Sequence, residues 1–256
     1  MNILQLNLQS RVLKRVTAIV LLLAGFASTA AAETSDEWES HLNVYLWGAS
    51  IGGRTADGSD LNVSFDDLLK NLQMGFMGTA AARKGKFVML ADLIYLDVSK
   101  SKSDSGEFLG QPIEEKGKLK LTGWVSTFGG GYSLINDGRN TLDILLAARY
   151  LNLDSTFTFK VDDESRKSDL GGVFWDGVVG LNGETSLSEK WYLAYYVDLG
   201  AGDSDFTWQT RLGFGYNLKK HSLFFGYRYL DWDFKSGDRL NDLNFHGPYA
   251  GVKFSF

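Results

Sequence analysis

The chain has 256 residues, of which 44% are hydrophobic, and it contains 29 glycines, two prolines and no cysteine. The lack of cysteine excludes disulfides and zinc sites built from thiolates. The formal charge of −5 at pH 7 argues against a surface that neutralises nucleic-acid phosphates. Because proline interrupts hydrogen-bond ladders, its scarcity favours a protein made of long strands.

The first 32 residues have the pattern of a secretory signal peptide. Three basic residues between positions 11 and 15 precede an apolar core at 16–27, and a run of alanines at 30–32 forms a small-residue cleavage site. The apolar core is short of the roughly 20 residues that a helix needs to span a bilayer. We therefore expect an exported protein with a mature chain of 33–256. That chain has 23 basic and 31 acidic residues, a formal charge of −8.

The last eight residues predict an amphipathic strand. Val252, Phe254 and Phe256 alternate with small or polar residues, which is the period of a strand with two different faces. A closed barrel needs such a strand at its end, because the last strand pairs with the first. The segment that begins with Tyr249 and Gly251 resembles the C-terminal assembly signal of bacterial outer-membrane β-barrels. This resemblance implies the barrel-assembly machinery as a partner.

Clusters of glycine and polar residues separate the stretches with a period of two. We predict ten strands, with eight or twelve as alternatives, because the phase of one stretch is ambiguous and the segment 50–72 has room for another strand. A short helix is expected at 64–72, with Ser64 as its N-cap. The predicted strands cover about 40–49, 73–82, 87–98, 118–134, 141–159, 173–187, 191–200, 206–218, 221–234 and 245–256.

Short and long connections alternate between these strands. The short ones centre near positions 85, 138, 189 and 219, and the longer ones near 60, 108, 166, 203 and 240. Outer-membrane barrels show this asymmetry, with short periplasmic turns and longer outer loops. An even number of strands then places both termini in the periplasm. The expected fold is all-β: an up-and-down antiparallel transmembrane β-barrel that forms a single domain over 33–256.

The two faces of each predicted strand differ in character. In the stretch 206–218, Leu212 and Phe214 face one way, whereas Arg211 and Gly213 face the other. A soluble periplasmic lipocalin-like binding barrel would bury the bulky face, and a membrane barrel would turn it toward lipid. Aromatic residues near both strand ends, with aliphatic residues between them, favour the membrane barrel. Those near the short connections are Trp191, Tyr216, Phe254 and Phe256, and those near the long ones are Tyr95, Tyr150, Trp208 and Tyr229.

The whole mature chain resembles small outer-membrane β-barrels of Gram-negative bacteria. The phrase VYLWG at 44–48 and the phrase ARKGKF at 82–87 are similar to an uncharacterised proteobacterial group of such barrels. The resemblance implies a location in the outer membrane, in contact with its lipid and lipopolysaccharide. It implies no activity and no cofactor.

Five charged residues are expected to face into the barrel near the middle of its strands: Asp92, Arg149, Asp198, Arg211 and Arg228. The positions of the turns place Asp198, Arg211 and Arg228 in one row across neighbouring strands, where arginine and carboxylate groups can pair. A ten-stranded barrel is too narrow for an open aqueous channel. We expect this charged layer either to fill the interior of a structural barrel or to line a narrow pore for a small solute.

An outer-membrane hydrolase is the alternative from a different class. It would need a site at the rim near the long connections, and His246 is the histidine expected there. The candidate partners of that histidine are Asp176, Asp238, Asp242 and Ser236. No motif supports this arrangement, so we assign no catalytic residue. Acidic runs in the predicted loops are interpreted as solvated charge, and no metal or cofactor site is predicted.

Overall fold

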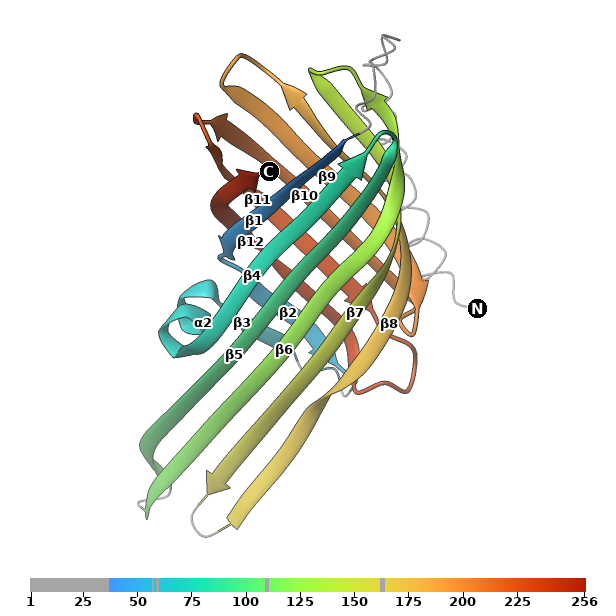
Figure 1. The fold of residues 1–256 in the computed structure, drawn as a ribbon. Helices are drawn as coiled ribbons and strands as arrows, with labels where there is room; N and C mark the ends of the chain where they lie inside the picture. The colour runs from blue at the N-terminus through green and yellow to red at the C-terminus, as the bar shows by residue number, and fades with distance from the viewer. Residues whose placement is uncertain (1–36, 57, 59, 109–110, 162–163) are drawn as a thin grey trace. The chain divides into compact units, whose positions relative to one another are not determined.

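The computed structural model describes residues 37–56, 58, 60–108, 111–161 and 164–256, and the predicted signal peptide lies outside these residues. Within the described part of the chain, twelve strands form one sheet that closes on itself (Figure 1). All of its strand pairs are antiparallel, which confirms the predicted all-β antiparallel barrel. No helix among the described residues is long and apolar enough to cross a membrane.

Ten of these strands form the closed wall, as predicted, and strands that follow one another in this series are neighbours. They are β1 (Trp38–Trp47), β4 (Leu72–Lys84), β5 (Phe87–Phe108), β6 (Gln111–Asn136), β7 (Asn140–Val161), β8 (Glu164–Ser186), β9 (Trp191–Gly202), β10 (Phe206–Asn217), β11 (His221–Asp233) and β12 (Leu240–Ser255). The ring closes because β1 pairs with both β4 and β12. The segment 50–72 holds the predicted helix, α2 (Phe65–Asn71), and also a hairpin of β2 (Ser50–Thr55) and β3 (Asp60–Val63).

Tight turns connect the wall strands at one end of the barrel, which we call the short-turn end. In the turn between β6 and β7, the residue types match the backbone conformation. Gly138 has a φ of 79°, in the left-handed region that glycine adopts without strain. Asp137 accepts hydrogen bonds from the side chain and the N–H of Asn140 and from the N–H of Arg139. These bonds stabilise the carboxylate and lower the pKa of Asp137.

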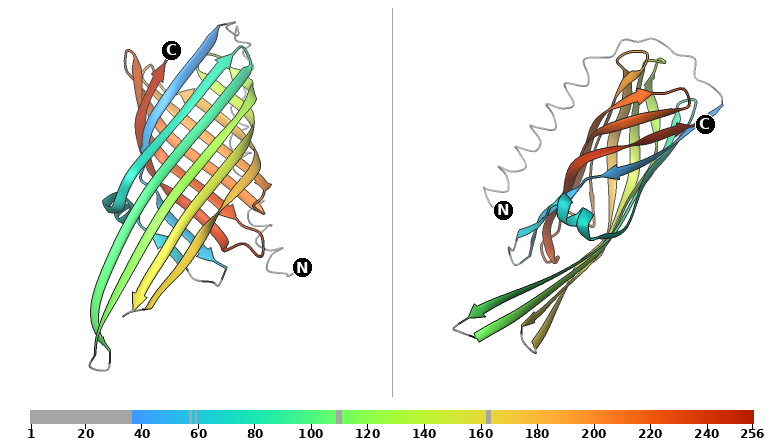
Figure 2. Two further views of the ribbon diagram at one scale, coloured as in Figure 1. Left: turned by 60° about the horizontal axis from the view of Figure 1, so that its bottom comes forward. Right: turned by 90° about the vertical axis from the view of Figure 1, so that its left-hand side faces the viewer.

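Two predicted loops at the opposite, long-loop end are wrong. The sequence predicts a loop at 99–117, but β5 and β6 stay paired through it as far as Phe108. The segment 160–172 likewise belongs to β7 and β8, which pair as far as Val161 and Glu164. Both hairpins extend past the rest of the wall (Figures 1 and 2). Hydrophobic periodicity does not reveal these extensions. Two polar strands can pair through their backbone N–H and C=O groups without an apolar face that would produce an alternating pattern.

The seam between the first and last strands changes partner along its length. In the short-turn half, Tyr249–Ser255 of β12 pair with His41–Trp47 of β1. In the long-loop half, Leu240–His246 of β12 pair with β2, so the predicted loop 235–244 is partly strand. The other edge of β2 pairs with β3 instead of β4. Helix α2 stands beside β4 at this point, with Leu68 buried in the core (Figures 1 and 2).

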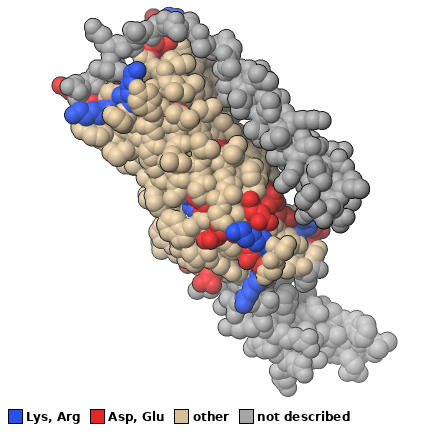
Figure 3. Space-filling view, turned by 90° about the vertical axis from the view of Figure 1, so that its right-hand side faces the viewer, with Lys and Arg blue, Asp and Glu red and all other residues tan. Residues whose placement is uncertain are grey.

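Bulky apolar side chains cover the outside of the wall. Leu212, for example, is 54% exposed, and the ring pairs Trp191–Tyr216 and Trp208–Tyr229 lie toward the short-turn and long-loop ends of the same sheet. Figure 3 shows charged residues gathered at the two ends of one face, with few between them. The lipocalin-like alternative, with the bulky face inside, is therefore wrong. In the ambiguous strand β6, the outward residues include Trp124, Phe128 and Tyr132.

The interior of the long-loop half is apolar, whereas the sequence predicts bulky apolar residues on the outward face of the strands only. Its fully buried side chains include Leu151, Leu230, Trp232 and Leu243, and they belong to one continuous hydrophobic core. Along β11, Leu230 and Trp232 continue the inward face of Arg228. Strands that are apolar on both faces lose their clear alternation, so the sequence pattern does not separate core residues from outward-facing ones here.

Candidate functional site

A layer of buried ion pairs crosses the lumen between its two halves. On one side, Arg149 of β7 donates from Nη2 to Oδ2 of Asp198 on β9, and both side chains are fully buried. The same guanidinium donates to the hydroxyl of Thr207 on β10 at 3.0 Å. The hydroxyl of Tyr196 donates to Asp198 Oδ2 at 2.5 Å. The Arg149 guanidinium therefore links β7 to the neighbouring strands β9 and β10, which lie beyond β8.

The second ion pair joins five strands. Arg228 of β11 donates from Nη2 to Asp92 Oδ2 of β5 at 2.7 Å, and it donates from Nε to Gln209 of β10 at 2.9 Å. The other oxygen of Asp92 accepts from the hydroxyls of Tyr45 on β1 and Thr79 on β4, each at 2.7 Å. Both oxygens of Asp92 are thus satisfied, as a buried carboxylate requires.

The fifth predicted residue, Arg211, stands apart from these pairs. The predicted cross-strand row is partly wrong: Arg211 lies opposite Arg228, but Asp198 lies opposite Gln209 rather than Arg211. The turn between β9 and β10 shifts the register by two residues, which leaves every side chain on its predicted face. The guanidinium of Arg211 lies over the ring of Tyr196, 4.7 Å from its centre.

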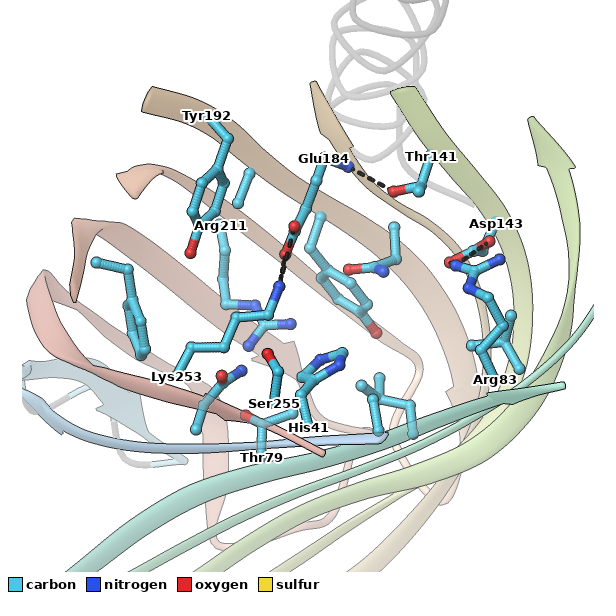
Figure 4. Close-up of a pocket in the computed structure, with 18 of the residues that line it drawn as sticks. His41, Thr79, Arg83, Thr141, Asp143, Glu184, Tyr192, Arg211, Lys253 and Ser255 are labelled. Atoms are coloured by element: carbon cyan, nitrogen blue, oxygen red, sulfur yellow. Dashed lines mark hydrogen bonds and ion pairs between the residues drawn. The ribbon is translucent and has the colours of Figure 1, made fainter. Parts of the chain in front are cut away.

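A cavity of about 480 Å³ occupies the short-turn half of the lumen (Figure 4). Two ion pairs lie in its wall. Lys253 Nζ is 2.7 Å from Glu184 Oε1, and Arg83 Nη2 is 2.8 Å from Asp143 Oδ2. Arg211 also faces the cavity, and exposed residues such as Glu39 lie at its rim. The cavity wall therefore combines charged and polar side chains with apolar ones, in contrast to the core on the other side of the layer.

The predicted C-terminal assembly segment forms the closing strand and part of this cavity. Val252 pairs with β1, and Phe254 makes a ring contact with His221 at the short-turn end. Phe256 is 79% exposed, and its backbone exchanges two hydrogen bonds with that of Ser40. The residues of the segment that line the cavity include Tyr249 and Lys253.

The structure does not bring the proposed hydrolase residues together around His246. The imidazole Nδ1 lies 3.0 Å from the hydroxyl of Tyr227, and the ring stacks on Tyr229 on the outside of the wall. Asp242 instead accepts a hydrogen bond from Arg54 at 2.8 Å. Asp176 is buried on the inner side and accepts from both the N–H and the hydroxyl of Ser204. The histidine and Asp176 therefore lie on opposite faces of the wall.

Sequence reasoning missed most partners of the charged layer. Tyr45 and Gln209 both face inward, and their positions on the inward side of the period of two were a usable signal. The pairs Lys253–Glu184 and Arg83–Asp143 are also inward on that pattern. The pattern does not show which of these residues pair, because in each pair the partners are separated by 60 or more positions and lie on non-adjacent strands.

No family model and no curated protein matches the chain. Among solved structures, it is similar to the outer membrane protease OmpT from Escherichia coli, with a TM-score of 0.51 and 9% identity over 90% of this chain and 100% of that one. It is also similar to the translocator domain of autotransporter NalP from Neisseria meningitidis, with a TM-score of 0.42 and 14% identity over 98% and 96% of the two chains.

A third similar structure is Ail, the attachment invasion locus protein of Yersinia pestis, with a TM-score of 0.31 and 10% identity over 86% of this chain and 99% of that one. The likeness to OmpT shows that the chain has the fold of the outer-membrane β-barrels. Identities this low show the fold alone, and a shared fold carries no activity with it.

Proposed function

We propose that this protein is a structural barrel of the bacterial outer membrane, without enzymatic activity, whose lumen is closed to solutes that would cross from one side to the other. The observation that carries this proposal is the pair of buried ion pairs at mid-lumen. In the pair Arg228–Asp92, the side chains are 1% and 4% exposed, and in Arg149–Asp198 both are fully buried. The apolar core beyond them adds a second barrier.

Energetics favour closure over the narrow pore. A conducting path would have to separate at least one buried ion pair, and breaking such a pair costs about 3–5 kcal/mol. It would also have to pass the fully buried rings and branched side chains around Trp232. Water and ions entering that apolar core would lose their hydrogen bonds without replacement.

The proposed orientation places the short turns in the periplasm and the long hairpins outside. It rests on the length asymmetry that outer-membrane barrels share. The band of exposed apolar side chains would then contact membrane lipid, and the long-loop end would contact lipopolysaccharide. The closing strand, with its exposed Phe256, would be the element that the barrel-assembly machinery recognises.

Conductance across a planar bilayer tests the closure. We expect the folded wild-type barrel to give no unitary current steps, with insertion verified by the shift in electrophoretic migration on boiling. Wild-type steps that disappear or change in size in Arg228→Ala would overturn the closed-lumen proposal. The same shift on boiling, measured on a purified outer-membrane fraction, tests the location. Recovery of the protein only from the soluble periplasmic fraction would contradict it.

A further inference from the structure

The cavity in the short-turn half is lined by a cation, Arg211, that forms no ion pair with a carboxylate of the described residues. In the layer of five predicted residues, three arginines face two aspartates. Asp92 is occupied by Arg228, and Asp198 by Arg149. No carboxylate among the described residues lies within ion-pair distance of Arg211. The remaining positive charge faces the cavity.

At its position, the Arg211 guanidinium is destabilised by the lack of an ion-pair partner. Arg211 lies directly opposite Arg228, another cation, and beside the ring of Tyr196, which holds it by a cation–π contact. It sits at the inner end of the cavity, next to the buried layer, where solvent screens charge less than at the surface. A buried or partly buried charge is stabilised by a counter-ion with matching hydrogen-bond geometry, and a carboxylate matches guanidinium in two places.

Aromatic side chains, among them that of Tyr192, stand with polar and charged ones in the wall around this charge (Figure 4). The ring of Tyr192 lies over Gly215 of β10, and the hydroxyl of Tyr249 reaches Gly213 of the same strand. A Cβ added at Gly215 would lie 1.9 Å from the ring of Tyr192, and one added at Gly213 would lie 2.4 Å from the hydroxyl of Tyr249. Larger residues at these positions would push both rings into the lumen. The two glycines therefore keep the cavity open.

Apolar side chains, including those of Leu90 and Phe224, also line the cavity. Each of the two further ion pairs in its wall joins one positive and one negative side chain, so neither leaves a net charge. A cavity of about 480 Å³ is within the range of small-ligand pockets, which combine apolar walls with a few fixed polar groups. A small molecule with one ring and one anionic group fits into a cavity of this size.

We propose that this cavity binds a small organic carboxylate with an apolar, ring-sized body, and that Arg211 holds the carboxylate. The ligand enters from the short-turn end, since the buried layer closes the other side; this direction of access rests on the proposed closed lumen. Binding itself needs only the cavity and the charge, so it is measured apart from conductance. A barrel that conducts yet binds the ligand would contradict the closed lumen alone.

Isothermal titration of the full barrel in a neutral detergent tests the site, with benzoate as the probe. Benzamide has the same shape without the charge, and inorganic phosphate has charge without the ring. Arg211→Gln removes the cation, and Arg139→Gln is the matched control, because Arg139 is exposed in the turn after β6. Ala194→Leu fills the cavity from β9 while keeping the charge. The shift in migration on boiling shows that each variant is folded.

We expect benzoate to bind wild type and Arg139→Gln equally, and to bind Arg211→Gln and Ala194→Leu at least roughly tenfold more weakly. Benzamide and phosphate should each bind wild type at least roughly tenfold more weakly than benzoate. The proposal is overturned if benzoate does not bind below about 10 mM, or if Arg211→Gln binds it as well as wild type does. Equal binding of benzamide would remove the role of the charge, and equal binding of phosphate would remove the role of the ring.

Discussion

The two halves of the lumen share one outer surface and have opposite interiors. In the short-turn half, the wall surrounds a cavity lined by ion pairs and tyrosines. In the long-loop half, the same strands enclose a dry core around Leu230 and Trp232, both fully buried. In a barrel that spans a membrane, the lipid constrains only the outward face of each strand. The inward face can either pack into a core or line a cavity. In this barrel the same strands do the first in the long-loop half and the second in the short-turn half.

The charged layer lies at the boundary between these two interiors. Its groups face an apolar core on one side, so their charges must be balanced within the layer. Arg149 and Arg228 meet this condition, whereas Arg211 is turned toward the cavity. The contrast between the paired arginines and Arg211 indicates that the residues of such a layer form ion pairs where they are fully buried.

Removal of one partner from the layer should have the largest effect. Arg149→Met leaves Asp198 buried and unpaired beside Tyr196, so we expect a loss of about 4 kcal/mol in the free energy of unfolding. Urea unfolding in lipid vesicles, followed by tryptophan fluorescence, measures it. The double variant Arg149→Met with Asp198→Leu should recover most of this loss, because no charge is left unpaired. A double variant as unstable as the single one would contradict the assignment of the pair.

Truncation of leucine in the two halves compares them directly. Leu230→Ala opens a void in the dry core, and we expect a loss of about 3 kcal/mol in unfolding free energy. Leu90→Ala only widens a cavity that already exists, so its loss should be smaller, about 2 kcal/mol or less. The same urea titration measures both. Equal losses would mean that the short-turn half is packed as tightly as the long-loop half.

The smallest effect is expected for the ion pair in the cavity wall. The side chains of Lys253 and Glu184 are 15% and 37% exposed, so solvent and salt screen their attraction. Glu184→Gln should cost about 0.5 kcal/mol at low salt and still less at high salt. Unfolding midpoints at two salt concentrations check this. A large loss that does not depend on salt would show that the cavity is as dry as the layer.

Much of the wall could be predicted from the sequence, because a strand repeats every two residues and every inward or outward position follows from that period. Leu212 outside and Arg228 inside follow from alternation alone, and the closing strand follows from the terminal alternation of Val252, Phe254 and Phe256. These features depend on local sequence and on the requirement that a barrel have no free edge.

Which inward residues meet, and where space remains between them, depends on how the whole wall closes. Arg149 finds Asp198 across β8, and Arg228 finds Asp92 across the lumen, at separations of 49 and 136 residues along the chain. The register between β9 and β10 then leaves Arg211 without a carboxylate. Such contacts depend on strand register and on the curvature of the closed wall, and no local pattern in the sequence encodes either of them.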